Sequence, residues 1–170
     1  MKKILLTITL LFSINLFADQ SFSIMFPSYD KFVKFIKDSG LTEEEIEFAY
    51  QNCDSDPQNA FICAMAYDYG YGLSDPKIEN WYLLAADADI HIGGKSAKYE
   101  YADYMIRHDK PGYIDKYFKA GDCYTKRSKG MCFYYLGMAK YLKNPKDCKY
   151  LMQAKRFGTK PNLVDRLCTK

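Results

Sequence analysis

The six cysteines are the residues whose chemistry the sequence defines best. Zinc sites commonly use Cys-x-x-Cys pairs or closely spaced histidines, but the chain contains neither, and its two histidines are His91 and His108. In an oxidising compartment, an even number of cysteines instead indicates disulfides. The sequence therefore predicts up to three disulfides and no metal site. The candidate residues are Cys53, Cys63, Cys123, Cys132, Cys148 and Cys168.

The spacing of these cysteines suggests pairing between neighbours, although six cysteines allow fifteen connectivities. Closing a loop of about 10–20 residues stabilises a fold by roughly 3 kcal/mol in the chain-entropy model. Nine, eight and nineteen residues lie between the members of the neighbouring pairs Cys53–Cys63, Cys123–Cys132 and Cys148–Cys168.

The N-terminal residues predict export, which would place these thiols in an oxidising compartment. Lys2 and Lys3 precede an apolar run over 4–12, and Ala18 provides a small residue for cleavage, as in a secretory signal. A membrane anchor is disfavoured because the apolar run is much shorter than the ~20 residues that span a bilayer. We expect a signal peptide over 1–18, a tether over 19–27 and one domain over 28–170, located in the periplasm or secreted.

Composition excludes several classes of protein. Charged residues make up 26% of the 170 positions, close to the globular average, which argues against a disordered chain. The net charge is +3, and loss of Lys2 and Lys3 with the signal would leave about +1. A general nucleic-acid binder needs a stronger basic character than this. A membrane bundle is excluded because no further apolar segment is long enough to span a bilayer.

Helical periodicity runs along the rest of the chain. Apolar residues recur every three or four positions, and capping signals precede them, as at Thr42 with Glu45 three residues later. No segment alternates with period two for the length of a strand, and residues 89–94 are interpreted as a loop. The predicted fold is all-α, with helices over 28–39, after Thr42, over 60–69, from Pro76 onward, and over 97–107, 112–122, 131–142, 145–157 and 162–168.

These helices form pairs that repeat. In each second helix a proline or glycine stands five residues before an aromatic residue, at positions 81, 117 and 150, which are 36 and 33 residues apart. Small residues of the first helices, Ala64, Ala102 and Gly137, recur at similar intervals. A period in the mid-thirties with two helices per unit is typical of an α-solenoid. Because sequential helix ends lie close together in a solenoid, we predict that the cysteines pair with their neighbours, as spaced above.

At these positions the chain resembles the Sel-1-like repeat family, a relative of the tetratricopeptide repeats. The resemblance is carried by Cys63-Ala64-x-x-Tyr67-x-x-Gly70-x-Gly72-Leu73 and by Trp81-Tyr82-x-x-Ala85-Ala86. With its cysteines and its predicted export, the chain is similar to the cysteine-rich Sel-1-like proteins of Helicobacter and its relatives. That resemblance implies a disulfide-stapled solenoid of antiparallel helix pairs.

Cysteine-rich members of this family are often called penicillin-binding proteins or β-lactamases, so a serine nucleophile is the alternative to a binding role. Ser-x-x-Lys occurs twice, beginning at Ser28 and at Ser74, but neither Ser-Asp-Asn nor Lys-Thr-Gly accompanies it. Both serines also have an interpretation as residues that begin a helix. The alternative function is therefore binding or hydrolysis of β-lactams or peptidoglycan fragments, with no catalytic residue assigned.

The first helices of a solenoid commonly line its binding groove. Tyrosine and methionine suit recognition, since they offer apolar area that is rigid or adaptable. We expect an exported, non-catalytic scaffold without a cofactor that binds a protein or peptide in an envelope, host-interaction or toxin-immunity role. An alternative for each groove residue is a place in the core, because tyrosine is abundant throughout the chain. The expected groove residues are Met65, Tyr69, Tyr99, Asp103, Met138 and Tyr141.

Overall fold

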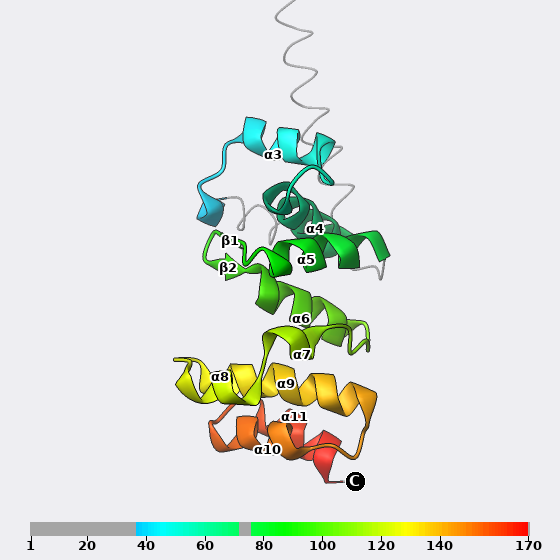
Figure 1. Cartoon of the computed structure of the whole chain (residues 1–170), viewed down its shortest axis with the longest axis vertical. Helices are drawn as coiled ribbons and strands as arrows, with labels where there is room; N and C mark the ends of the chain where they lie inside the picture. The colour runs from blue at the N-terminus through cyan, green and yellow to red at the C-terminus, as the bar shows by residue number, and fades with distance from the viewer. Residues whose placement is uncertain (1–36, 72–75, 170) are drawn as a thin grey trace, which may run out of the picture.

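The protein is mostly helical, and its helices stack in chain order along one long axis (Figure 1). The structure, a computed structural model, describes residues 37–71 and 76–169. The predicted signal peptide and tether lie outside these residues, as do Ser28 and Ser74. The elements are α3 (Glu43–Gln51), α4 (Pro57–Tyr71), α5 (Pro76–Asp87), β1 (His91–Ile92), β2 (Lys95–Ser96), α6 (Ala97–Arg107), α7 (Ile114–Tyr117), α8 (Ala120–Thr125), α9 (Lys129–Lys143), α10 (Lys149–Arg156) and α11 (Pro161–Cys168).

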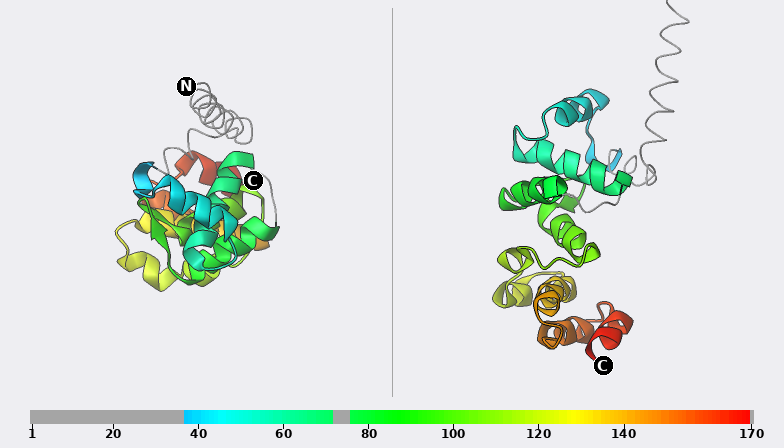
Figure 2. Two further views of the ribbon diagram at one scale, coloured as in Figure 1. Left: turned by 90° about the horizontal axis from the view of Figure 1, so that it is seen from above. Right: turned by 90° about the vertical axis from the view of Figure 1, so that its right-hand side faces the viewer.

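Most helices pack mainly on their neighbours in the chain, whereas α7 packs mainly on α9. Helix α4 packs on α5, α5 on α6, and α9 on α10. Two views at right angles show α3 near one end of the stack and α10 with α11 at the other (Figure 2). Within the described residues, no helix combines the length and the apolar character needed to cross a membrane.

Several helix boundaries confirm the capping and periodicity predictions. The Thr42 hydroxyl accepts a hydrogen bond from the Glu45 amide at 3.2 Å, and the Glu45 carboxylate accepts one from the Thr42 amide at 2.8 Å. This reciprocal pair satisfies two amides that have no partner within the helix. Helix α6 begins at Ala97 and ends at Arg107, as predicted.

The helix predicted over 112–122 is wrong, because two short helices, α7 and α8, occupy this stretch. Phe118 ends α7 with an extended backbone, at φ −119° and ψ 92°. Its ring is 1% exposed and packs edge-on against Tyr99 at 5.1 Å and in a tilted arrangement against Tyr135 at 5.0 Å. We attribute the break to this burial, since the aromatic contacts outweigh the hydrogen bonds that a continuous helix would add.

The loop predicted over 89–94 is also corrected, because residues 91–96 form a small antiparallel hairpin. His91 pairs with Ser96 and Ile92 with Lys95. Gly93 and Gly94 make the two-residue turn with φ values of +57° and +72°. Such turns need positive φ at both positions, which glycine adopts without a steric penalty.

Aromatic rings from successive helices fill the core. Trp81 is 5% exposed, and Tyr82 and Tyr104 are fully buried with ring centroids 5.4 Å apart. Many of the sixteen tyrosines thus serve packing. The largest fully buried aromatic side chains are Tyr82, Tyr101, Tyr104, Phe61, Phe118 and Phe133.

The disulfides have the predicted neighbour pairing, and none of the six cysteines is free. Cys53 bonds to Cys63 between α3 and α4, and the second disulfide joins α8 to α9. The third connects the start of α10 to the end of α11. Three disulfides in a chain of this size indicate folding in an oxidising environment. The bonds are Cys53–Cys63, Cys123–Cys132 and Cys148–Cys168.

Helices α9 and α10 approach most closely at Gly137. A Cβ atom at this position would lie 2.6 Å from the backbone nitrogen of Leu151 and 2.9 Å from its side chain. We expect Gly137→Ala to lower the free energy of unfolding by about 1–2 kcal/mol, because the cost of overpacking exceeds the gain in helix propensity. Urea denaturation measures this loss.

Gly121→Ala is the matched control. Gly121 also lies in a helix, α8, and no atom stands within 4 Å of the Cβ that it would gain. We expect this variant to be as stable as the parent protein or up to about 1 kcal/mol more stable. If Gly137→Ala matched it, α9 and α10 would not be in close contact at this point.

Candidate binding site

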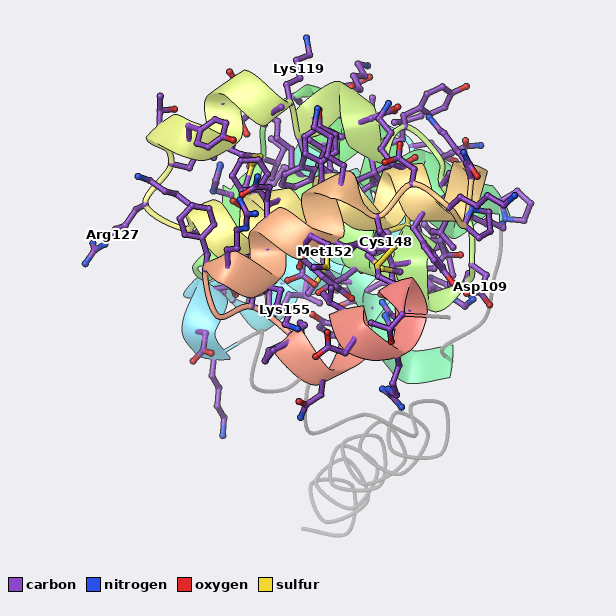
Figure 3. All side chains as sticks on the ribbon, turned by 90° about the horizontal axis from the view of Figure 1, so that it is seen from below. Asp109, Lys119, Arg127, Cys148, Met152 and Lys155 are labelled. Atoms are coloured by element: carbon purple, nitrogen blue, oxygen red, sulfur yellow. A yellow bond between two sulfur atoms is a disulfide. The ribbon has the colours of Figure 1, made fainter. Side chains whose placement is uncertain are left out.

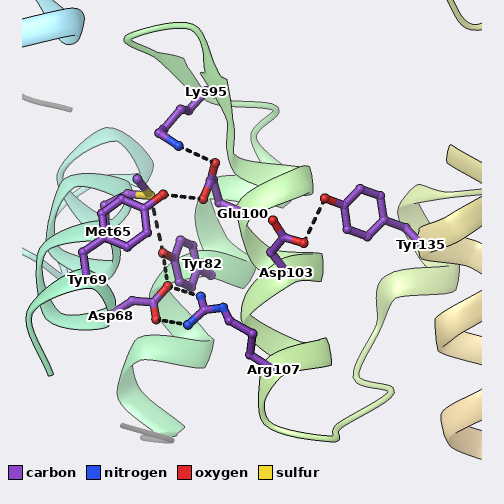
Figure 4. Close-up of polar contacts among 9 residues, drawn as sticks. All are labelled: Met65, Asp68, Tyr69, Tyr82, Lys95, Glu100, Asp103, Arg107 and Tyr135. Atoms are coloured by element: carbon purple, nitrogen blue, oxygen red, sulfur yellow. Dashed lines mark hydrogen bonds and ion pairs between the residues drawn. The ribbon is translucent and has the colours of Figure 1, made fainter. Parts of the chain in front are cut away.

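Helix α6 presents acidic and basic side chains on one face. Glu100, Asp103 and Arg107 follow one another at intervals of three and four residues, so they lie along the same side of the helix. Their side chains contact residues of α4 on one side and of α9 on the other (Figure 4). We call this surface the α6 face and define it as Tyr69, Tyr99, Glu100, Asp103, Arg107 and Tyr135.

A buried ion pair anchors one end of the face. The Arg107 guanidinium donates to both carboxylate oxygens of Asp68, at 2.8 and 2.6 Å. The Asp68 side chain is 0% exposed, whereas that of Arg107 is 46% exposed. A bidentate, charge-assisted contact of this kind fixes both the distance and the relative orientation of the two side chains. Residues 39 positions apart thus tie α4 to α6.

Tyr82 of α5 completes this buried group. Its hydroxyl donates to Asp68 at 2.8 Å and lies 3.4 Å from the sulfur of Met65. Burial raises the pKa of Tyr82, and the Asp68 carboxylate raises it further, so the hydroxyl stays protonated and remains a donor. Asp68 therefore accepts hydrogen bonds from two different helices, which compensates for the removal of its charge from water.

At the other end of the face, both carboxylate oxygens of Glu100 accept hydrogen bonds from within the protein. The Tyr69 hydroxyl donates to one carboxylate oxygen at 2.8 Å, and Lys95 donates to the other at 3.0 Å. Burial raises the pKa of Tyr69, followed by the effect of the Glu100 carboxylate. Glu100 is thus neutralised by a lysine from the hairpin and held by a tyrosine from α4.

Asp103 differs from its two acidic neighbours, because it is exposed and pairs with no cation. The Tyr135 hydroxyl of α9 donates to its Oδ1 atom at 2.9 Å. Among the described residues, no lysine or arginine lies within 4.0 Å of this carboxylate. Desolvation by the surrounding helices raises the pKa of Asp103, and its Tyr135 hydrogen bond opposes this rise.

The structure brings three of the predicted groove residues together and separates the others. Tyr69, Tyr99 and Asp103 all belong to the α6 face. Met65 is 0% exposed and Met138 is 7% exposed, so both belong to the core and neither offers a surface to a partner. Here the alternative interpretation of a core residue was the right one, since both helices are buried on more than one side. The sixth residue, Tyr141, is half-buried against the core.

The histidines form no site together. His108 caps the end of α6 and stacks on Tyr104 at 4.6 Å. Its Nε2 atom is buried, and no described residue forms a hydrogen bond with it. Burial lowers the pKa of His108, and the Arg107 charge acts in the same direction. His91 lies 3.4 Å from Asp89 in an exposed turn.

The described part of the chain contains no group of three His, Cys, Asp or Glu side chains arranged to hold a metal ion. Basic residues of the turns near α8 are exposed. Seen from the C-terminal end, Lys119 and Arg127 project away from the stack (Figure 3).

Asp68, Tyr82, Arg107 and Tyr135 were not identified from the sequence as members of a site. One signal was present for Asp68: it is the single charged residue in the otherwise apolar and small-residue stretch from Ala60 to Tyr71. A lone charge in such a helix needs a partner. The sequence does not reveal which of the many basic residues provides that partner.

Comparison of the chain with known proteins found no matching family model, no matching curated protein and no matching solved structure.

Proposed function

We propose that the protein is an exported, non-catalytic scaffold that binds a protein or peptide partner through the α6 face. Three helices, α4, α6 and α9, contribute side chains to this surface, and hydrogen bonds between the helices hold them in place. Recognition surfaces work best on rigid elements whose side chains are already positioned. The three disulfides support a role outside the reducing cytosol.

We also propose that the stacked helix pairs form an α-solenoid of the Sel-1-like type. The small residues at the repeated positions support this, because Ala64 and Ala102 are 0% exposed and Gly137 lies against the backbone of α10. Trp81 and Tyr82, at the aromatic positions of the repeat, are buried as well. In a solenoid each unit contacts mainly its neighbours, as these helices do.

The observation that carries the proposed function is the contrast between Asp103 and the acids beside it. Asp68 and Glu100 are each neutralised within the fold by a basic side chain. Asp103 has no such counter-charge: it accepts a hydrogen bond from the neutral Tyr135 hydroxyl, and the nearby Glu100 carboxylate repels it. Exposed polar groups held in place beside aromatic residues are typical of recognition surfaces.

Site-specific photocrosslinking in the native cell tests this proposal. We expect a photoreactive phenylalanine at Tyr99 to capture a discrete partner, because Tyr99 belongs to the α6 face. The same probe at Leu84 of α5 is the control, since Leu84 is 41% exposed and lies outside this face. Equal capture at both positions, or no capture at Tyr99, would contradict the proposed function.

An enzymatic assay addresses the alternative. The purified protein is expected to leave a chromogenic β-lactam unchanged. Turnover that disappears in Ser28→Ala or Ser74→Ala would show that the protein is a hydrolase rather than a scaffold.

A further inference from the structure

The charges of the α6 face leave one negative charge without a counter-charge. Arg107 is committed to Asp68 by two hydrogen bonds, and Lys95 is committed to Glu100. Asp103 receives only the neutral hydroxyl of Tyr135. Arg107 and Lys160 attract the Asp103 carboxylate from farther away, but neither forms an ion pair with it. The face is therefore complementary to a cation.

The hydrogen bonding of Asp103 leaves room for that cation. Tyr135 occupies one side of Oδ1, and no donor from the described residues bonds to Oδ2. Asp103 is exposed, so a side chain from outside can reach it. An approaching ammonium or guanidinium group would meet a carboxylate whose orientation the Tyr135 hydroxyl has already fixed, which lowers the entropic cost of pairing.

Aromatic rings stand beside this carboxylate. The Tyr99 ring is half-buried and packs edge-on against Tyr135 at 5.4 Å, whereas Tyr135 is 3% exposed and supports Asp103 from the core side. The faces of such rings attract cations, and their edges accommodate the methylene groups of lysine and arginine side chains. A carboxylate beside the partly exposed Tyr99 is thus matched to a side chain that is apolar along its stem and charged at its end.

We propose that the partner inserts a lysine or arginine side chain into the α6 face, with its cationic group on Oδ2 of Asp103 and its stem against Tyr99. This inference rests on the proposed function and names the chemistry of the partner at that site. The neighbouring acids Asp68 and Glu100 keep their own internal cations, so Asp103 alone receives the partner's charge.

Selection from a library of random 12-residue peptides, with the purified disulfide-bonded protein as bait, tests the proposal. We expect the selected peptides to be enriched in lysine or arginine, and their binding to weaken as salt increases. The separate abundance of lysine and of arginine among them shows which cation the face prefers.

Asp103→Asn is the decisive variant, because asparagine keeps the acceptor for Tyr135 but removes the charge. We expect it to bind the selected peptides about tenfold more weakly than the parent protein and with a smaller salt dependence. Glu44→Gln, an equal change of charge at an exposed position of α3, is the control and should bind as the parent does.

The outcomes separate this inference from the proposed function. Peptides without basic enrichment, or equal binding by Asp103→Asn, would overturn the inference while capture at Tyr99 still supported the scaffold role. Selection of no peptide at all would overturn the inference, and the absence of capture at Tyr99 as well would overturn both.

Discussion

Replacement of Trp81 by alanine is expected to lower the melting temperature by about 10 °C. Large aromatic-to-alanine changes in a core cost about 3–5 kcal/mol, and 1 kcal/mol corresponds to roughly 2–4 °C in a domain of this size. Trp81 is 5% exposed, and its ring lies 5.5 Å from that of Tyr67. Its indole N–H also donates to Asp54 at 2.6 Å, so the substitution removes a hydrogen bond as well as packing.

Calorimetry measures this loss, and fluorescence provides an independent check because Trp81 is the only tryptophan. The native protein should emit at short wavelength and resist quenching by acrylamide until it unfolds. Trp81→Phe, which retains an aromatic ring, is the control and should lose clearly less stability than Trp81→Ala. Red-shifted, freely quenched emission from the native protein would show that the indole is in contact with water.

Arg107→Met should destabilise the protein by about 3 kcal/mol. It leaves the Asp68 carboxylate, which is 0% exposed, without a counter-charge. Removing one partner of a buried ion pair costs about 3–5 kcal/mol. We expect the low end of this range because Arg107 is itself 46% exposed and water can reach the space that it leaves. Chemical denaturation near neutral pH gives the free energy of unfolding.

A second substitution shows whether charge or packing is responsible. Asp68→Asn keeps an acceptor for the Tyr82 hydroxyl but removes the negative charge. We therefore expect the double variant Asp68→Asn/Arg107→Met to be more stable than Arg107→Met alone, although it carries one more change. If the two losses simply added, the buried charge would not be the cause.

The sequence predicted local features of the fold well where they depend on neighbouring residues. The capping box at Thr42, the bounds of α6 and the pairing of the cysteines all follow from short-range patterns. The break at Phe118 does not, because it depends on two rings from other helices, those of Tyr99 and Tyr135. The hairpin had a signal, the pair Gly93-Gly94, but its strands are too short for alternation to reveal them.

The α6 face was only partly predictable for a similar reason. Tyr99 and Asp103 could be placed on one helix by their spacing. The partners of Asp103 and Arg107 come from other helices, and no spacing rule connects them. Tyr69 was expected to be a free groove residue, but its hydroxyl is held by Glu100. Tyr69→Ala would therefore disturb the fold as well as the surface, which makes Asp103→Asn the cleaner test of binding.

The positions of the disulfides determine where the molecule is mechanically weakest. One bond lies at the end of the stack that contains α3 and α4, and the other two lie among α8 to α11. All six cysteines are used in these bonds, so no covalent link crosses α5, α6 and α7. Tension applied to the two ends of the described chain is carried through this middle section by side-chain packing and by the Asp68–Arg107 pair. Under load, we expect the disulfides to keep the loops at the two ends closed, so that the middle section extends first. The buried Asp68–Arg107 ion pair would resist this extension.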